Sequence, residues 1–208
     1  MPTETEDLIP TRETLLSRLR DLEDQTSWRE FFETYWKLIF NVVRKAGFSE
    51  AAAQDIVQET FVTISRHMPE FRFQPAMGSF KTWLLQITRS RIIDALRRKH
   101  SKQGDQYVRR EEPLSTSLLE SVSDEGGPLD AIWDAEWHAH LLDTALEYVK
   151  RHADARQFQI FYLHVVKNVS ALQVACRLGV KLPEVYFAKY KISARVKKEI
   201  KRLESNPP

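Results

Sequence analysis

The chain has 208 residues, of which 42% are apolar and 29% charged, with eleven Phe, and this composition excludes wholesale disorder. Its single cysteine, Cys176, excludes an intramolecular disulfide, and the sequence has no spaced His/Cys cluster typical of a zinc site. The net charge of +2 conceals strong segregation: residues 81–110 hold nine Lys/Arg against two acids, residues 185–202 hold seven against one, and residues 111–147 hold ten acids and no Lys or Arg.

Charges interrupt every hydrophobic stretch of the sequence. The chain shows neither a signal-peptide pattern nor an apolar run of about 18 residues, so we expect a cytoplasmic protein without membrane insertion. Six Gly and nine Pro, with no sustained apolar-polar alternation, favour helices over a many-stranded sheet. The predicted fold class is all-α.

Leucines at steps of three and four predict a short leading helix over residues 11–23. Ser27 and Glu30 have the spacing of a capping box, in which each side chain satisfies a free backbone N–H of the other. They predict a helix from Ser27 to about Lys45. Its expected apolar face is Trp28, Phe31, Phe32, Tyr35, Ile39 and Val42.

Two further helices are predicted in the first half of the chain. Gly47 ends the aromatic helix, and Ser49 caps a helix that runs to about residue 67. A loop over residues 70–78 follows, and Ser79 then caps a long helix to about Lys99.

Residues 101–128 are rich in Ser, Gly, Pro and acids and have little periodicity, which is typical of a flexible linker. We therefore predict two small helical domains joined by a flexible acidic linker. The predicted divisions are an N-terminal extension with a short helix (1–26), a first domain (27–100), the linker (101–128) and a second domain (129–208).

The second domain begins with predicted helices over residues 129–152 and 157–166. Ser170 and Gln173 form another capping box, and Pro183 opens a later helix at its first turn. Between them, Ala175, Gly179 and Val185 have the spacing of a helix-turn-helix, in which a glycine makes the tight turn and an apolar residue anchors the second helix. The turn before Pro183 lacks a Ser or Thr cap.

Aromatic and basic residues gather around the loop and the helix that follows it. Phe71, Phe73, Phe80 and Trp83, beside Arg72, Lys81 and Arg89, are the ingredients of a site for single-stranded DNA, where rings stack on bases and cations hold the backbone. The polar face of the same helix carries Ser90, Asp94, Arg97 and Arg98. The alternatives are that Phe80 and Trp83 belong to the core and that the basic face is simply solvated.

Asp55 and Glu59 lie one helical turn apart, opposite the apolar face of their helix. Like charges at this spacing weaken a helix slightly, so the pair does not serve the helix itself. A basic partner surface would account for it, and an ordinary acidic exposed face is the alternative.

The helix after Pro183 presents polar and basic side chains that could reach base edges or phosphates of duplex DNA. The candidates are Lys181, Glu184, Tyr186, Lys189, Tyr190 and Arg195. No catalytic triad, phosphate loop or paired-carboxylate arrangement has a plausible context, so we expect no enzyme, no metal site and no cofactor.

Four sequence pieces in this order resemble those of a known family. They are the run AQDIVQETF from Ala53 to Phe61, the run GSFKTWL from Gly78 to Leu84, the run DALRR from Asp94 to Arg98, and the C-terminal helix-turn-helix. This order is similar to that of bacterial sigma factors of the extracytoplasmic-function (ECF) type in the sigma-70 family.

The resemblance implies a role for each piece. Asp55, Gln58, Glu59 and Phe61 would bind the β′ clamp helices of core RNA polymerase. Residues 71–78 and the helix after them would take the promoter minus-ten element. The C-terminal helix would read the minus-thirty-five element, with the β flap of the polymerase and an anti-sigma factor as further expected partners.

Two other functions remain open at this point. A stand-alone helix-turn-helix regulator would bind duplex DNA without polymerase, but it leaves Asp55 to Phe61 unexplained. A helical enzyme would need a pocket that the sequence does not advertise. A separate hypothesis is autoinhibition, with residues 111–147 lying over the basic surfaces of the free protein and screening them from DNA.

Overall fold

The computed structural model describes residues 12–71, 80–103 and 126–205. Within these ranges the protein is helical and contains no strand, which confirms the all-α prediction. Internal contacts divide the chain into two units: unit 1 runs up to Trp137, and unit 2 runs from His138 to Ser205. None of the described helices is long and apolar enough to cross a membrane.

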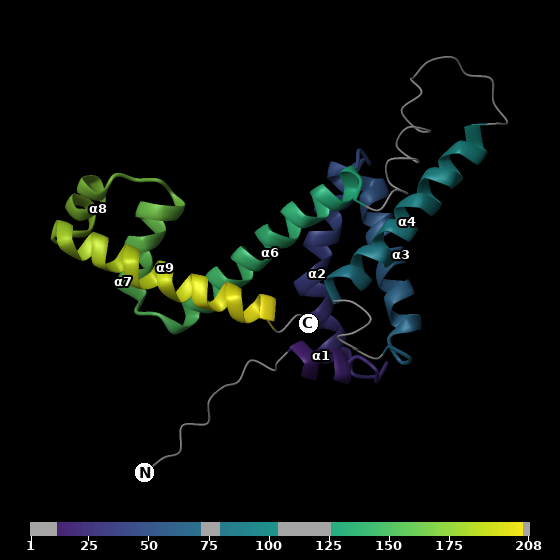
Figure 1. The fold of residues 1–208 in the computed structure, drawn as a ribbon, viewed down its shortest axis with the longest axis horizontal. Coiled ribbons are helices and arrows are strands. Elements are labelled where there is room, and N and C mark those ends of the chain that lie inside the picture. The colour runs from purple at the N-terminus through teal and green to yellow at the C-terminus, as the bar shows by residue number, and fades with distance from the viewer. Residues whose placement is uncertain (1–11, 72–79, 104–125, 206–208) are drawn as a thin grey trace, which may run out of the picture. The chain divides into compact units, whose positions relative to one another are not determined.

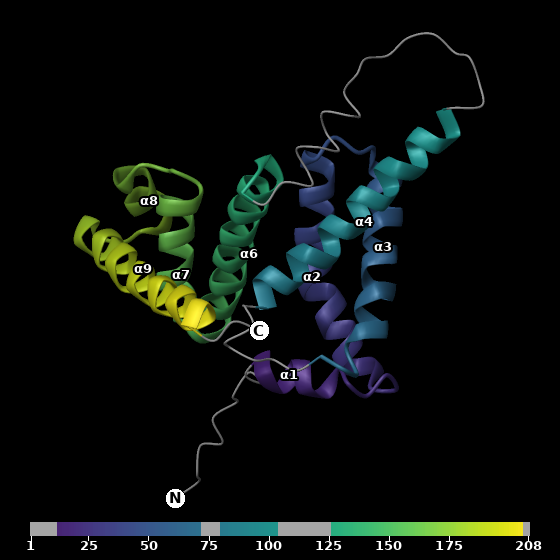
Figure 2. The same cartoon turned by 45° about the vertical axis from the view of Figure 1, so that its right-hand side comes forward.

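Unit 1 contains α1 (Arg12–Arg18), α2 (Gln25–Lys45), α3 (Glu50–His67), α4 (Phe80–Gln103) and the start of α6 (Pro128–His152). Helices α2 and α3 pack side by side, α4 packs against α3, and α1 packs against the start of α2 (Figures 1 and 2). The leading helix is shorter than its predicted range of 11–23, because the chain turns after Arg18.

The start of α2 corrects the prediction of a capping box at Ser27. Asp24 is the N-cap residue, and its side chain accepts a hydrogen bond of 3.0 Å from the backbone N–H of Ser27. Ser27 is already inside the helix and buried, where its hydroxyl donates to Asp24 over 2.5 Å and accepts from Arg18 over 2.6 Å. The carboxylate of Glu30 lies 3.4 Å from the guanidinium of Arg18 and does not form the predicted capping box with Ser27.

The turn between α2 and α3 confirms the predicted signals. Gly47 has a φ of +94°, a left-handed conformation that a residue with a Cβ adopts at a cost, and it follows the last turn of α2. The hydroxyl of Ser49 accepts a hydrogen bond of 3.3 Å from the backbone N–H of Ala52. The predicted cap of α4, Ser79, lies outside the described residues.

Aromatic rings form the centre of unit 1. Phe31 and Tyr35 of α2 are buried against Phe80 of α4, at centroid distances of 6.1 and 5.4 Å. Aliphatic side chains of α2, α3 and α4 complete this core, among them Leu38, Ile39, Val42, Ile56, Ile64, Leu84 and Ile92. Phe32, predicted on the buried face, is instead 41% exposed.

The first turns of α6 belong to unit 1, although the sequence-based division began the second domain at residue 129. Leu129, Trp133 and Trp137 are buried, and Trp137 stacks on Tyr35 of α2 at a centroid distance of 6.4 Å. Helix α6 itself is continuous and covers the predicted range of 129–152. The division therefore falls inside a helix, because its two halves bury their apolar sides in different units.

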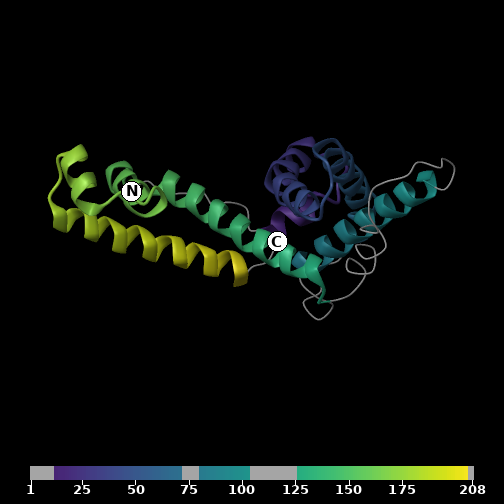
Figure 3. The ribbon, with the colours of Figure 1, turned by 90° about the horizontal axis from the view of Figure 1, so that it is seen from above.

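Unit 2 holds the second half of α6 together with α7 (Ala155–Phe161), the π-helix η2 (Tyr162–Val166), α8 (Ala171–Leu178) and α9 (Leu182–Ser205). The C-terminal part of α9 lies next to the second half of α6 (Figure 3). The guanidinium of Arg202 in α9 lies 5.6 Å from the centroid of the Tyr148 ring in α6. The α-helix predicted over residues 157–166 is thus part α and part π.

Helix α8, a tight turn and α9 pack around Ile160, Ala171, Val174, Val185 and Ala188. Ser170 caps α8, as predicted, by accepting a hydrogen bond of 3.3 Å from the Gln173 N–H. Gly179 ends α8 with a φ of +60°, and the N–H of Val180 closes the turn on the Ala175 carbonyl at 3.0 Å. Gly179 thus lies at the end of α8, and Val185 of α9 is buried in the core of unit 2.

Candidate functional site

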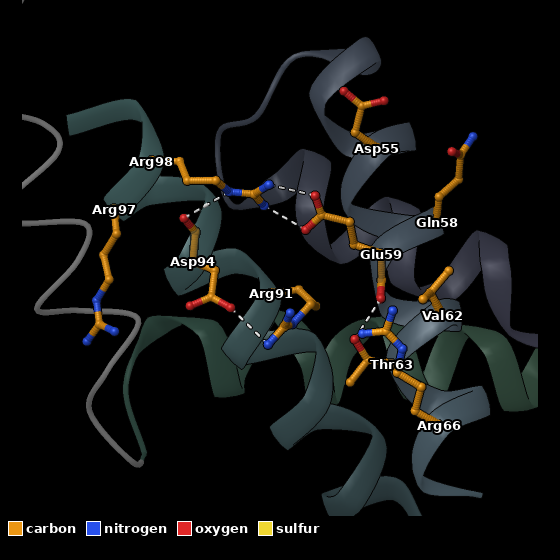
Figure 4. Close-up of a pocket in the computed structure, with 10 residues that line it drawn as sticks. All are labelled: Asp55, Gln58, Glu59, Val62, Thr63, Arg66, Arg91, Asp94, Arg97 and Arg98. Carbon is orange, nitrogen blue, oxygen red and sulfur yellow. Dashed lines mark hydrogen bonds and ion pairs between the residues drawn. The ribbon is translucent and has the colours of Figure 1, made fainter. Parts of the chain in front are cut away.

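Helices α3 and α4 enclose an open pocket of about 780 Å³ in unit 1 (Figure 4). The α3 side contributes Asp55, Gln58, Glu59, Val62, Thr63 and Arg66, and the α4 side contributes Arg91, Asp94, Arg97 and Arg98. The structure therefore brings together predicted polymerase-binding and predicted minus-ten residues, which are about forty positions apart in the sequence.

Glu59 and Arg98 join the two walls of this pocket. The guanidinium nitrogens of Arg98 donate hydrogen bonds of 2.7 and 2.6 Å to the two carboxylate oxygens of Glu59. Because these bonds favour the charged forms, they lower the pKa of Glu59 and raise that of Arg98. Next to the pair, the carboxylate of Asp94 forms an ion pair of 2.8 Å with the guanidinium of Arg91 (Figure 4).

The remaining predicted polymerase-binding residues differ in exposure. Asp55 and Gln58 are exposed at the rim of the pocket and point away from the Glu59–Arg98 pair (Figure 4). Phe61 is half-buried, with its ring 5.8 Å from that of Phe31 and 4.7 Å from that of Phe32 on α2. Asp55 and Gln58 are thus available to a partner, whereas Phe61 mainly packs α3 against α2.

Burial leaves fewer of the predicted aromatic rings available to stack on bases of single-stranded DNA. Phe80 is fully buried in the core of unit 1, so its ring cannot stack on a base, and this corrects the prediction that it binds DNA. Trp83 is half-buried, with its ring 4.4 Å from that of Phe71 and 5.5 Å from that of Phe80. Arg72 and Phe73 lie outside the described residues.

Two of the predicted DNA-binding cations are already paired with acids of α6. Arg89 forms an ion pair with Asp130, and the ammonium of Lys81 lies 2.6 Å from the carboxylate of Asp134. By contrast, Ser90 and Arg97 of α4 are exposed. The basic face predicted on α4 is therefore partly neutralised within unit 1.

On α9, the carboxylate of Glu184 accepts a hydrogen bond of 3.1 Å from the backbone N–H of Lys181. Glu184 thereby supplies the carboxylate half of a capping box, a role that the sequence did not predict for it. The other candidates, Tyr186, Lys189, Tyr190 and Arg195, are exposed, with Tyr190 reaching 77%.

Sequence reasoning missed several residues at these surfaces. Phe187 is 58% exposed beside Tyr186 and Tyr190, and the ammonium of Lys191 lies over its ring at 5.6 Å. The sequence pattern identified Asp130 and Asp134 of α6 only as part of the acidic residues 111–147 and not as partners of α4 cations. Their spacing did carry a signal, because Asp130 and Asp134 share one helical face, adjacent to the face of Trp133 and Trp137.

Among the described side chains, no group of three or more His, Cys, Asp or Glu is placed to hold a metal ion. Cys176 is a free, exposed thiol on α8.

Residues 31–102 match the family model described as Sigma-70 region 2. The chain is 28% identical over 93 residues to the ECF RNA polymerase sigma factor RpoE of Cereibacter sphaeroides, which covers 44% of this chain and 49% of that protein. It is 34% identical over 97 residues to the probable RNA polymerase sigma factor of Haemophilus influenzae, which covers 47% of this chain and 44% of that protein. The matches thus span about half the length of these curated relatives.

The matched stretch contains α2 from Phe31 onward, all of α3 and all but the last residue of α4. Helices α3 and α4 line the pocket and carry the predicted polymerase-binding residues and most of the predicted minus-ten residues. Region 2 is therefore present as a folded unit with its exposed acidic rim. On these grounds residues 31–102 are similar to Sigma-70 region 2, and nearly half of the chain is similar to RNA polymerase sigma factors, one of them of the ECF type.

Proposed function

We propose that this protein is an RNA polymerase sigma factor that directs transcription initiation. The observation that carries the proposal is the sigma-70 region 2 match over residues 31–102, where α3 presents exposed Asp55 and Gln58 beside a fixed Glu59. The proposed partners are core RNA polymerase and promoter DNA, the proposed location is the cytoplasm, and an anti-sigma factor is a further partner to look for.

The α3 rim is proposed to dock on the β′ clamp helices. Asp55 and Gln58 are exposed and offer acceptors to a basic partner surface, while Arg98 keeps Glu59 ionised and in one orientation. Such surfaces fix orientation and speed association through complementary charge. Phe61 supports the proposal indirectly, because it holds α3 on α2.

The Phe71 and Trp83 pair is proposed to receive the minus-ten element as single-stranded DNA. Both rings are partly exposed, and a base stacked on such a ring gains about 1–3 kcal/mol. This gain is of the same order as the few kcal/mol that unstacking a base costs. Arg97 and Ser90, exposed on α4, are the proposed backbone contacts.

Helix α9 is proposed to read the minus-thirty-five element as duplex while unit 2 contacts the β flap. The exposed Tyr186, Lys189, Tyr190 and Arg195 supply polar groups for base edges and phosphates. Two weak DNA surfaces held on one polymerase bind as a single stronger site, because the second contact becomes intramolecular.

Run-off transcription from a pool of genomic fragments, with bacterial core RNA polymerase and with or without this protein, tests the proposal. We expect transcripts that require the protein and that disappear with Asp55→Arg/Glu59→Arg. Since Glu59→Arg also breaks an internal ion pair, Asp55→Arg/Gln58→Arg repeats the test with exposed residues only. Asp143→Arg/Glu147→Arg, which changes exposed acids on α6, is the control and should retain transcription.

Absence of transcripts, together with a footprint on duplex DNA by the protein alone, would overturn the proposal in favour of a stand-alone regulator. Retention of full activity by both α3 variants would instead reject α3 as the polymerase-binding surface.

A further inference from the structure

The first three turns of α6 are anchored in unit 1 by large apolar side chains. Leu129 is 2% exposed, Trp133 0% and Trp137 5%. Burial of side chains of this kind contributes about 1.5–3 kcal/mol each. Residues 128–137 are therefore held in unit 1 by packing, with Trp137 stacked on Tyr35 of α2, independently of any charge.

The same three turns carry three acids, and each is paired with a cation of unit 1. Asp130 pairs with Arg89 and Asp134 with Lys81, both on α4. Glu136 lies 2.5 Å from Lys45 of α2 and accepts a hydrogen bond of 3.0 Å from Asn41.

The two ion pairs between α6 and α4 differ in their exposure to solvent, and hence to a competing phosphate. The Arg89 and Asp130 side chains are 13% and 23% exposed, so water reaches them poorly. The Lys81 and Asp134 side chains are 28% and 58% exposed, so this pair lies at the rim. An exposed ion pair contributes little stability, about 1 kcal/mol or less, so a phosphate can compete for its cation.

Carboxylates and phosphates use the same donors on Lys and Arg. We propose that residues 128–137 form an acidic clasp that occupies Lys81 and Arg89 and thereby lowers the affinity of the free protein for nucleic acid. The regulatory meaning rests on the proposed function, in which α4 meets the minus-ten DNA, and on the sequence-based prediction that Lys81 and Arg89 contact its backbone. In this form, the autoinhibition predicted for residues 111–147 depends on two carboxylates, those of Asp130 and Asp134.

The clasp is tested with the full-length protein alone, by fluorescence anisotropy of a labelled single-stranded oligonucleotide across a range of salt concentrations. We expect Asp130→Asn/Asp134→Asn to bind several-fold more tightly than the wild type. The dependence of log affinity on log salt should steepen by about 0.7 for each cation that now meets a phosphate.

The matched control is Glu33→Gln/Asp143→Asn, which removes the same two charges from exposed positions on α2 and α6. If the clasp variant and this control bind the oligonucleotide equally, the gain is only one of net charge and the clasp is rejected. If Asp130→Asn disturbs the start of α6, the single variant Asp134→Asn tests the clasp, because Asp134 lies at the rim. The expected change in salt dependence is then half as large.

Failure of the clasp and failure of the proposed function give different results. The anisotropy measurement contains no polymerase, so it decides the clasp whether or not the protein supports transcription. Transcripts with the wild type, together with equal DNA affinity of the variant and its control, would reject the clasp alone. Tighter DNA binding by the variant without any transcripts would reject the sigma function and keep the clasp.

Discussion

Arg98 of α4 and Glu59 of α3 face each other with both guanidinium N–H groups on both carboxylate oxygens, at 2.7 and 2.6 Å. The backbone carbonyl of Asp94 accepts a further, longer hydrogen bond of 3.3 Å from the Arg98 Nε. Glu59 was predicted to bind polymerase and Arg98 to bind DNA. One ion pair thus connects the two proposed functions of unit 1.

A double-mutant cycle on Glu59→Gln and Arg98→Gln should give a coupling energy of about 1 kcal/mol or less. The side chains are 37% and 54% exposed, so water screens the pair and limits its contribution to stability. Urea denaturation of the four proteins measures the coupling. A value near 3 kcal/mol would mean that the pair is essential to the packing of α3 on α4.

Local signals in the sequence predicted most helix boundaries. Ser49, Ser170 and Gly179 each act within a few residues of the boundary that they mark, and the structure confirms all three. At α2 the same reasoning failed, because Asp24 competes for the cap and Ser27 is drawn into the buried contact with Arg18. A three-residue spacing alone does not show which of two nearby caps is used.

The candidate site was less predictable, because its geometry depends on residues far apart in the sequence. Phe80 was one of the predicted stacking residues, and its contacts with Phe31 and Tyr35 place it in the core. The neutralisation of Arg89 depends on Asp130, 41 positions away. Composition showed an acidic segment after a basic one, but only the fold shows which charges meet.

Replacing Gly179 with Ala should destabilise the α8 and α9 turn by about 1–2 kcal/mol, the cost of placing a Cβ in the left-handed region. Apart from its neighbours in the chain, no atom of the residues that the structure describes lies within 4 Å of the position that the Cβ would take, so the cost is conformational. Asn tolerates this conformation, and Gly179→Asn should therefore cost less. Hydrogen exchange of the α8 and α9 amides measures both variants, and equal protection in all three proteins would contradict the prediction.

The stability of unit 1 should depend on pH through Glu136. Burial favours the neutral acid, but hydrogen bonds from Lys45 and Asn41 outweigh it and lower the pKa of Glu136 below its ordinary value of 4.5. The stabilisation is thus complete above about pH 4.5 and is lost as the pH falls through the lowered pKa. Glu136→Gln should cost about 1–2 kcal/mol at pH 7 and progressively less below pH 4.5.

Urea denaturation at several pH values, with Glu147→Gln as the control, measures this difference. Glu147 is on the same helix but its side chain is 60% exposed, so its substitution should have little effect at any pH. A stability difference for Glu136→Gln that stays constant from pH 7 to pH 3 would show that the ionised carboxylate is not what stabilises unit 1.

Trp133→Ala should destabilise unit 1 by about 3–5 kcal/mol, because Trp133 is fully buried and the substitution leaves a large cavity. Its indole N–H is buried without a hydrogen-bond partner among the described residues, so Trp133→Phe loses less than the change in volume alone implies. Leu142→Ala, at a position on the same helix that is 44% exposed, serves as the control. Hydrogen exchange read separately for α2 and α9 locates the loss. If the start of α6 is part of the core of unit 1, the α2 amides should lose protection while the α9 amides keep it. Loss of protection in α9 with α2 unchanged would place Trp133 in unit 2 and would remove the anchor on which the clasp depends.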